Sequence, residues 1–482
     1  MPVGNIHFLA TEATRTAENS SAFRDKIREG TGWEVSLLEK GEEGRIGALG
    51  VVASLGFGGD GGDDGNGQVK GGLVMDLGGG STQITWVILE RKGGVRTSPR
   101  SFSFPYGAAA LKGRLEQIRD NGKGKKELQE EMMRDFQQAH KDLEVPHQLA
   151  EQGLDLYLCG GGFRGWGYLL MEQASVNPYP IPIINGYRVR KEEFHDTTSV
   201  LDTVSEEVKV FGVSKRRASQ VPAVAFLVNV LVDALPDIQN IQFCQGGVRE
   251  GFLFDRLPPE IRAEDPLLAA TRPYATPSAD IFQRLLSSAL PTSSPASFTP
   301  QLLSALANLL YSHLSVPKES RCAAALHSTT SGLLASANSL THVDRALLAL
   351  ALCERWDGDL APTDQSLHRR LRQCVPAEEA WWCQYLGRVG TLIGDIYPAG
   401  RVFANGDRWR VQLEAHMDMV SKKGDQSLLR LQVYWNQDAP AGLVLRDGLY
   451  EHGENIEKAG KKKKWVEGHG VKVEVAIAPL SL

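Results

Sequence analysis

The sequence predicts an α/β domain followed by a C-terminal α+β region. Three apolar, strand-like stretches each run into a cluster of glycines, at residues 73–82, 154–167 and 241–251. After residue 300 leucines recur at helical spacing, and after residue 400 apolar and polar residues alternate as they do in half-buried strands. The chain of 482 residues is long enough to bury two or three hydrophobic cores.

Composition argues against two classes of protein. The net charge is −5 and no basic stripe interleaves with aromatic residues, so we expect no nucleic-acid partner. The most apolar stretch, residues 221–235, contains Asn229 and Asp233 and is too short to cross a bilayer, which predicts a buried helix and no membrane partner. The six cysteines form no C-x-x-C pair, which is typical of free thiols in a reducing compartment without structural zinc.

The first predicted elements are a strand over residues 33–38 and a helix after it. Ile46, Leu49 and Ala53 recur at helical spacing, and we expect them to face the sheet. Glu42 and Glu43 lie where this helix begins. Taken alone, they are best explained as an acidic first turn that the helix dipole favours. A Gly- and Asp-rich loop over residues 56–72, which we interpret as a flexible insertion, separates this helix from the next strand.

Residues 73–89 predict a β-hairpin with a glycine turn. Glycine has no Cβ, so the backbone N–H groups of Gly78, Gly79 and Gly80 can approach a phosphate closely. Ser81 and Thr82 add hydroxyl donors, and a carboxylate at Asp76 can hold a water or a Mg²⁺ shell beside that phosphate. A tight turn with incidental glycines explains this motif alone equally well.

Further along the chain, residues 122–143 predict a polar, solvated helix. The cluster that starts at Gly160 fits G-x-G-x-x-G, a pattern of dinucleotide sites. However, prolines at 178, 180 and 182 interrupt the region where the second strand and its acidic residue are expected.

The C-terminal half divides by composition into a Pro/Ser-rich connector over residues 259–300, a helical domain over 301–400 and a small antiparallel β region over 401–482. His342 and Asp344 do not form a metal-binding dyad, and we interpret His342 as a residue at a helix start.

Several segments together resemble one family, the exopolyphosphatase/guanosine pentaphosphatase (Ppx/GppA) family. The segments occur in family order and lie within residues 6–258. They are Ala10 to Arg15, Glu42 to Arg45, Asp76 to Thr82, Gly160 to Arg164 and Val248 to Gly251. The resemblance implies an actin-like ATPase (ribonuclease H-like) fold with two lobes. Residues 1–72 would be the remnant of an incomplete first lobe and residues 73–258 the second, phosphate-binding lobe.

The resemblance also implies roles for individual residues. Glu43 would be the general base. Asp76, Gly78, Gly79, Gly80, Ser81 and Thr82 would hold phosphate, with Mg²⁺ bound to Asp76 through water. Gly160, Gly161 and Gly162 would form the wall of the cleft. Apart from the resemblance, we expect Arg164 to brace its turn rather than contact the ligand, and Arg249 and Glu250 to form an internal ion pair that supports the cleft.

One departure from the family pattern leads to two hypotheses about the function. The family has an earlier hairpin of the D-x-G-S-N type, which this chain lacks, so we expect an N-terminally shortened sequence. The sequence of residues 217–223 resembles that of the fungal retrograde-regulation branch of the family. The first hypothesis is therefore a cytoplasmic signalling protein that binds a nucleotide or polyphosphate and a regulatory protein partner. The alternative is an active phosphoanhydride hydrolase.

Overall fold

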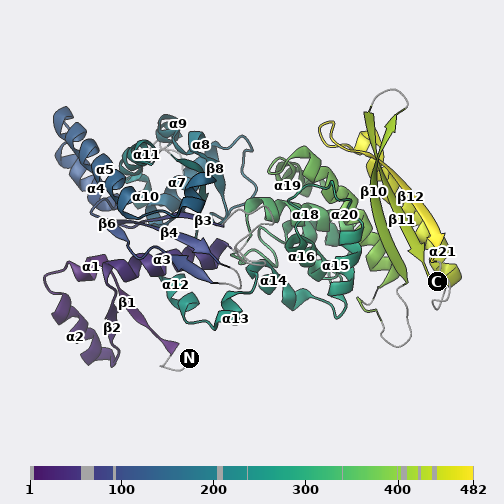
Figure 1. Ribbon diagram of the computed structural model, residues 1–482, viewed down its shortest axis with the longest axis horizontal. Coiled ribbons are helices and arrows are strands. Elements are labelled where there is room, and N and C mark those ends of the chain that lie inside the picture. Colours follow the sequence, from purple (N-terminus) through teal and green to yellow (C-terminus); the bar gives the residue numbers. More distant parts are fainter. Residues whose placement is uncertain are drawn as a thin grey trace. The chain divides into compact units, whose positions relative to one another are not determined.

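The computed structural model describes residues 5–55, 70–90, 94–203, 210–235, 237–338, 340–398, 400–402, 410–421, 425–436 and 442–480 (Figure 1). Most of the glycine-rich insertion expected at residues 56–72 lies outside this part of the chain. The chain divides into two compact units. The N-terminal unit contains Met1–Asn177 and Ile183–Glu264, and the C-terminal unit contains Pro178–Pro182 and Asp265–Leu482.

The N-terminal unit alternates strands and helices. In chain order these are β1 (Phe8–Ala10), α1 (Glu12–Arg15), α2 (Ser20–Thr31), β2 (Val35–Leu37), α3 (Lys40–Leu55), β3 (Gly71–Leu77), β4 (Thr82–Leu89), β5 (Val95–Thr97), β6 (Phe102–Phe104), α4 (Ala108–Gln117), α5 (Gly122–Asp142), α6 (His147–Glu151), β7 (Leu154–Cys159), α7 (Gly160–Gln173), β8 (Arg188–Arg190), α8 (Lys191–Phe194), α9 (Thr197–Thr203), α10 (Lys215–Ala218), α11 (Val221–Ala234), β9 (Ile238–Phe243), α12 (Val248–Asp255) and α13 (Pro259–Arg262).

A mixed β-sheet forms the centre of this unit. Its described strands follow the order β5-β4-β3-β7-β9-β8, and β6 pairs with β4. Strands β3, β7 and β9 run parallel, whereas β4 runs antiparallel to β3, so the hairpin predicted at residues 73–89 is confirmed. Because the carboxyl ends of parallel strands meet at one edge of a sheet, the segments that follow β3, β7 and β9 come together there.

Helix α3 lies against this sheet. Ala48, Val51 and Leu55 on the helix pack in one core cluster with Val74 of β3 and Val87 of β4. The helix is apolar on several sides because its other face meets α12. At that crossing a methyl group on Gly50 would overlap the backbone of Gly247, and one on Gly251 would overlap the carbonyl oxygen of Ile46. The close approach therefore depends on glycine, and it fixes the start of α3 beside the edge of the sheet.

The C-terminal unit begins with helices and ends with a small sheet. Its elements are α14 (Pro266–Thr271), η3 (Arg272–Tyr274), α15 (Ala279–Ser288), α16 (Pro300–Leu309), η4 (Lys318–Ser320), α17 (Arg321–His327), α18 (His342–Arg355), α19 (Pro362–Arg372), α20 (Ala377–Ile396), β10 (Val411–Ser421), β11 (Asp425–Trp435), α21 (Gly442–Glu457), η5 (Lys458–Gly460), η6 (Lys462–Lys464) and β12 (Lys472–Pro479).

Two features of this unit differ from the sequence-based expectation. Residues 259–300 are not a loose connector, since they contain α13, α14 and α15, and Phe282 and Leu286 of α15 are fully buried. Prolines stand at the starts of α13 and α14, where a missing N–H costs nothing. The C-terminal sheet is also mixed, because β10 and β11 are antiparallel whereas β12 pairs parallel to β11. Helix α21 provides the crossover between these parallel strands.

Other expectations are confirmed. Residues 122–142 form helix α5, and the apolar stretch at 221–234 forms the buried helix α11. His342 is the first residue of α18, behind the N-cap residue Thr341. Within the described residues, the helices are too short or too polar to cross a membrane.

Candidate functional site

A cavity of about 710 Å³ opens at the carboxyl edge of the central sheet. It receives backbone and side chains from each of the three strand-to-glycine junctions: the turn after β3, the start of α7 and the segment that leads into α12. Helix α1 and the start of α3 close it from the N-terminal side. The lining includes Glu12, Glu43, Asp76, Gly78 to Ser81, Gln83, Gly160, Arg164 and Gln245 to Glu250.

The glycine turn after β3 orients several backbone N–H groups toward this cavity. The carbonyl oxygens of Gly78, Gly79 and Gly80 accept hydrogen bonds from the N–H groups of Ala108 (2.9 Å), Ala109 (3.0 Å) and Gly107 (3.2 Å), at the start of α4. In a trans peptide the carbonyl and the following N–H point in opposite directions. The N–H groups of Gly79, Gly80 and Ser81 therefore point away from α4, on the side that lines the cavity. Successive N–H groups in this arrangement suit an anion.

Two helices present their N-termini to the same space. Gly160 begins α7, and its φ of +86° is a left-handed conformation that favours glycine. The segment Gly246 to Val248 leads into α12, where the N–H of Gly247 donates to the side chain of Glu250 (3.0 Å). The positive ends of both helix dipoles favour a negatively charged ligand in the cavity.

Glu43 is held at the cavity wall by two donors. Nη2 of Arg15 lies 2.8 Å from Oε2 of Glu43, and Nε2 of Gln83 donates to Oε1 at 3.3 Å. Arg15 also pairs with Glu12 at 2.7 Å and donates to the carbonyl oxygen of Leu38, which fixes it between α1 and β2. Burial raises the pKa of Glu43, the hydrogen bond from Arg15 acts in the opposite direction, and the charge of Glu12 adds to the rise.

Asp76 is the penultimate residue of strand β3, just before the glycine turn. Burial raises the pKa of its carboxyl to about 6, and the negative charge of Glu43 contributes to this rise, while Arg164 opposes it. A Cβ on Gly160 would overlap Oδ1 of Asp76, so only glycine allows α7 to start this close to the carboxylate. The negative charges of Glu43 and Asp76 repel each other across the cavity.

The sequence-predicted residues separate into two groups in space. Glu43, Asp76, Gly78, Gly79, Gly80, Ser81 and Gly160 all line the cavity. Thr82 does not, because its hydroxyl is fully buried and donates to the carbonyl oxygen of Tyr106 at 2.9 Å. Gly161 and Gly162 also lie outside the lining, since residue 162 packs against Leu77 and residue 161 faces a separate small cavity beside α11.

Two further expectations change. Glu250 forms a helix cap with Gly247, and no Arg249–Glu250 ion pair occurs among those found in the described residues. Arg164 lines the cavity as well as bracing its helix, where its Nε donates to the carbonyl oxygen of Gly160 at 3.3 Å.

Sequence reasoning did not assign Arg15, Glu12 or Gln83 to the site. Arg15 and Glu12 fall in the segment 10–15 that resembles the family, so their position in that motif was the available signal. Gln83 lies in β4, two residues after Ser81, and so projects to the same face of the hairpin. Its Nε2 bridges Ser81 Oγ (2.9 Å) and Glu43.

The acidic side chains of the N-terminal cavity could hold Mg²⁺ only together with the oxygen atoms of a bound ligand. Within the described residues, no three or more His, Cys, Asp or Glu side chains converge as a metal site needs. Glu12 and Glu43 are engaged with Arg15, which leaves Asp76 as the acidic group nearest the glycine turn. Mg²⁺ commonly binds through one or two carboxylates, waters and the phosphates of a substrate, and Asp76 fits that mode.

Comparison with known proteins gives two family matches. Residues 1–260 match the Ppx/GppA phosphatase family and residues 265–480 match the RTG2 C-terminal domain. The chain is 37% identical over 444 residues to Retrograde regulation protein 2 of Saccharomyces cerevisiae (strain ATCC 204508 / S288c), which covers 88% of this chain and 72% of the relative. The family resemblance identified from the motifs is thus confirmed.

Solved structures of the same family align with the chain at low similarity. The Aquifex aeolicus Ppx/GppA phosphatase aligns with a TM-score of 0.37 and 21% identity, over 52% of this chain and 75% of that one. An exopolyphosphatase from Cytophaga hutchinsonii ATCC 33406 aligns with a TM-score of 0.36 and 17% identity, over 52% and 75% of the two chains.

Proposed function

Because this chain belongs to the Ppx/GppA phosphatase family, we propose that its N-terminal cavity binds a nucleotide or polyphosphate and that the protein acts in retrograde regulation, the signalling from mitochondria to the nucleus. The role in retrograde regulation rests on the 37% identity to the yeast relative of that name. We extend the proposal to a cytoplasmic protein whose ligand occupancy controls a regulatory protein partner.

The glycine turn is the observation that carries the binding proposal. Three consecutive N–H groups, from Gly79 to Ser81, face away from α4 on the cavity side, and the N-termini of α7 and α12 meet the same space. An arrangement of free N–H groups and helix dipoles stabilises phosphate without a requirement for many basic side chains. Arg164 adds one positive charge at the wall.

The roles of the acidic residues follow from their surroundings. Asp76 would hold Mg²⁺ through water beside the ligand phosphates, and Mg²⁺ would supply neutralisation of their charge. The pKa of Asp76 is about 6 without a ligand. A cation beside the carboxyl group would stabilise its ionised form and so lower this pKa.

The alternative function, hydrolysis of a phosphoanhydride, has one specific observation in its favour. Glu43 lines the cavity with a raised pKa, as a general base requires near neutral pH. In that reaction Glu43 would take a proton from water while the water oxygen attacks the terminal phosphorus and the remaining phosphate chain leaves. Glu43 keeps free lone pairs for this step, because Arg15 and Gln83 each occupy one site on the carboxylate.

Binding is tested by calorimetric titration of the full chain with ATP and Mg²⁺ and, separately, with polyphosphate. We compare Gly79→Ala with Gly113→Ala as its matched control. No atom lies within 4 Å of the Cβ position at either residue, so both variants should fold. The methyl group at residue 79 would narrow the anion-binding turn, and we expect binding about tenfold or more weaker, whereas the control in α4 should bind like the wild type. Equal affinity of both variants would contradict the assignment of this turn.

Hydrolysis is tested by phosphate release from polyphosphate, ATP and guanosine pentaphosphate in the presence of Mg²⁺. Release by the wild type that falls about 100-fold or more in Glu43→Gln would establish the hydrolase and its base. Binding without release by the wild type would assign the cavity to ligand sensing. The Glu43→Gln variant keeps the size of the side chain, so its ligand affinity serves as the control for folding of the site.

A further inference from the structure

The C-terminal unit contains a second, larger cavity of about 1080 Å³. It lies among η4, α17, the end of α18, the segment before α19, α20 and α21, and all of its lining belongs to this one unit. Arg355, the last residue of α18, lines it although the residue is only 4% exposed. A buried arginine at the wall of a cavity needs a partner for its charge, since an unpaired charge inside a protein is strongly unfavourable.

A row of glycines on α20 provides the space for this arginine. Gly387 and Gly390 allow α18 to pack closely, with the backbone of Ala351 and the side chain of Arg355 against them. A methyl group on Gly394 would overlap Nη2 of Arg355. The side chain therefore lies along α20 in a channel that only small residues leave open. On its other side the guanidinium carbon is 4.3 Å from the ring centre of Trp356.

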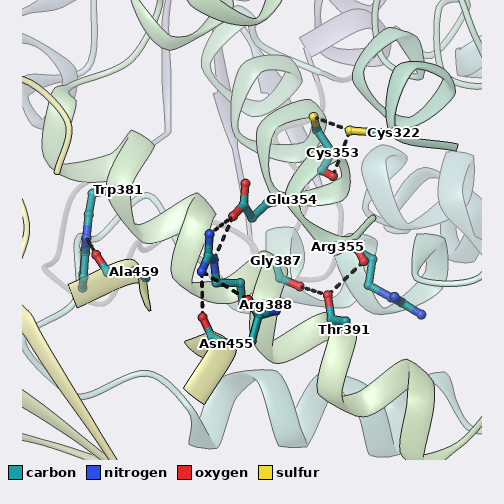
Figure 2. Close-up of polar contacts among 10 residues, drawn as sticks. All are labelled: Cys322, Cys353, Glu354, Arg355, Trp381, Gly387, Arg388, Thr391, Asn455 and Ala459. Atoms are coloured by element: carbon teal, nitrogen blue, oxygen red, sulfur yellow. Dashed lines mark hydrogen bonds and ion pairs between the residues drawn. The ribbon is translucent and has the colours of Figure 1, made fainter. Parts of the chain in front are cut away.

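Among the described residues, the guanidinium of Arg355 has neither a hydrogen-bond acceptor nor a carboxylate within ion-pair distance. Its Nε is buried without a partner, and Figure 2 shows only the backbone oxygen of Arg355 in a polar contact, with Thr391. Burial lowers the pKa of Arg355, and the charges of Asp395 and Asp357 act in the opposite direction.

The Nη groups of two other buried arginines of the unit, Arg388 and Arg345, have acceptors. Arg388 donates to Glu354 at 2.6 and 2.8 Å and to the carbonyl oxygen of Asn455 at 2.7 Å (Figure 2). Arg345 donates through its two Nη groups to the carbonyl oxygens of Thr329, Leu334 and Ala337, although its Nε, like that of Arg355, is buried without a partner. Arg355 differs from these two arginines because neither of its Nη groups has an acceptor among the described residues and because its side chain lines a cavity.

The charges around the cavity limit the kinds of ligand that it can bind. Lys318, Arg321 and Arg355 are basic, but five acidic residues also line it: Glu319, Asp357, Asp359, Asp395 and Glu451. This acidic excess disfavours a polyphosphate, so the ligand differs from the one proposed for the N-terminal cavity. Arg321 shares the Trp356 ring with Arg355, at 5.1 Å from its centre, which places two guanidinium groups around one aromatic surface.

We propose that this cavity is a second ligand site, in which Arg355 binds the single carboxylate or phosphate group of a small organic molecule. Amino or hydroxyl groups of the same molecule then face the carboxylates of the lining, such as Asp357. The guanidinium is suited to this role because its planar donors match the two oxygens of a carboxylate or phosphate. The stacked Trp356 ring holds the donors in place before the ligand arrives.

The binding test uses the full chain and three probes: acetate, glycine and inorganic phosphate, each observed by ligand-detected NMR. Acetate and phosphate separate the two kinds of anionic group, and glycine adds an amino group for the acidic wall. All measurements are made in the Gly79→Ala background to weaken phosphate binding at the N-terminal cavity, and the difference between this parent and its Arg355→Met variant reports the C-terminal cavity. We expect at least one probe to bind and its affinity to fall about tenfold or more in Arg355→Met.

A second variant displaces the guanidinium without removing its charge. In Gly394→Ala the new methyl group must push Nη2 of Arg355 aside, and we expect the same probe to bind more weakly. Gly448→Ala is the matched control, because that helical glycine of α21 has no atom within 4 Å of its Cβ position. Failure of all three probes to bind the parent up to about 50 mM, or unchanged binding in Arg355→Met, would overturn the proposal.

Thermal unfolding separates a binding arginine from a structural one. Without ligand, Arg355→Met should leave the midpoint of the C-terminal unit unchanged or raise it, since an apolar side chain replaces an unpaired charge. A loss as large as that of Arg388→Met would show that Arg355 supports the fold instead, and would overturn the proposal. The bound probe should raise the midpoint of the parent chain but not that of Arg355→Met.

Discussion

Arg15 joins the acidic residues of the N-terminal cavity into one charged cluster. It pairs with Glu12 and Glu43, and the charge of Glu43 in turn acts on Asp76. Burial works against the charged form of Arg15, but its hydrogen bonds with Glu43 and Glu12 raise its pKa overall. Glu43 and Asp76, the two carboxyl groups nearest the glycine turn, both have raised pKa values. Binding of a proton or a cation is therefore favourable at this position.

The first prediction concerns the pH dependence of stability. The pKa of Asp76 is raised from 3.8 to about 6, so the folded protein binds this proton more tightly than the unfolded chain. Its contribution to stability is fully present below about pH 3.8 and is lost as the pH rises through about 6. Asp76→Asn should therefore stabilise the ligand-free protein at pH 7 by roughly 1–3 kcal/mol, and this difference should shrink as the pH falls through about 6 and nearly vanish at about pH 4.

Urea unfolding between pH 4 and pH 8 measures this effect. Asp155→Asn is the control, because Asp155 lies on β7 of the same sheet and accepts hydrogen bonds from Arg188 (3.3 Å) and Asn240 (2.9 Å). Asparagine keeps one acceptor oxygen but loses the charge and the second oxygen that contacts Arg188, so this variant should lower stability. An Asp76→Asn variant that is less stable than the wild type at pH 7 would contradict the desolvation of Asp76.

At the scale of elements, the crossing of α3 and α12 determines where Glu43 and the start of α12 meet. Gly50 of α3 lies directly against the backbone of Gly246 and Gly247. Gly44 of the same helix faces Ser101, so the first turns of α3 are also closely packed. Small residues at these positions hold two cavity walls at a fixed separation.

The second prediction tests this crossing with Gly50→Ala and Gly47→Ala. A Cβ at residue 50 overlaps the carbonyl group of Gly247, so we expect a loss of about 1–3 kcal/mol in the free energy of unfolding. No atom lies within 4 Å of the Cβ position at residue 47, so there the gain in helix propensity should stabilise by about 0.5–1 kcal/mol. Chemical denaturation measures both, and equal effects of the two substitutions would refute the close contact.

At the scale of the whole molecule, the chain has two units with separate buried cores. The N-terminal core gathers around the central sheet, for example Leu73, Leu156 and Ile241. The C-terminal core gathers around α18 and α20, for example Leu352, Tyr385 and Leu392. The segment Pro178–Pro182 belongs to the C-terminal unit, where the hydroxyl of Tyr179 lies 2.8 Å from Nδ1 of His342.

The third prediction is that calorimetry resolves two unfolding transitions, which the variants assign. Arg388→Met leaves the buried Glu354 carboxylate unpaired, and we expect the C-terminal transition alone to lose about 3–5 kcal/mol. Gly50→Ala should lower the other transition alone. A single transition that both substitutions shift equally would contradict independent unfolding of the units.

The amino-acid sequence alone predicted the fold class, the hairpin at residues 73–89, helices α5 and α11, and the glycine turn with Asp76 at the N-terminal cavity. These follow from local properties, because strand alternation, glycine clusters and apolar spacing are written in consecutive residues. The family motifs added Glu43, which charge pattern alone assigned to a helix start.

The tertiary structure decided which of these residues share a surface. Thr82 and Gly162 stand beside the correct motifs but face Tyr106 and Leu77, because each residue of a turn or helix points in a direction that its neighbours in space select. Arg15 and Gln83 reach Glu43 from sequence distances of 28 and 40 residues. The position of Arg355 depends on the glycines of α20, and its guanidinium has no acceptor among the residues that the structure describes; both features come from long-range packing.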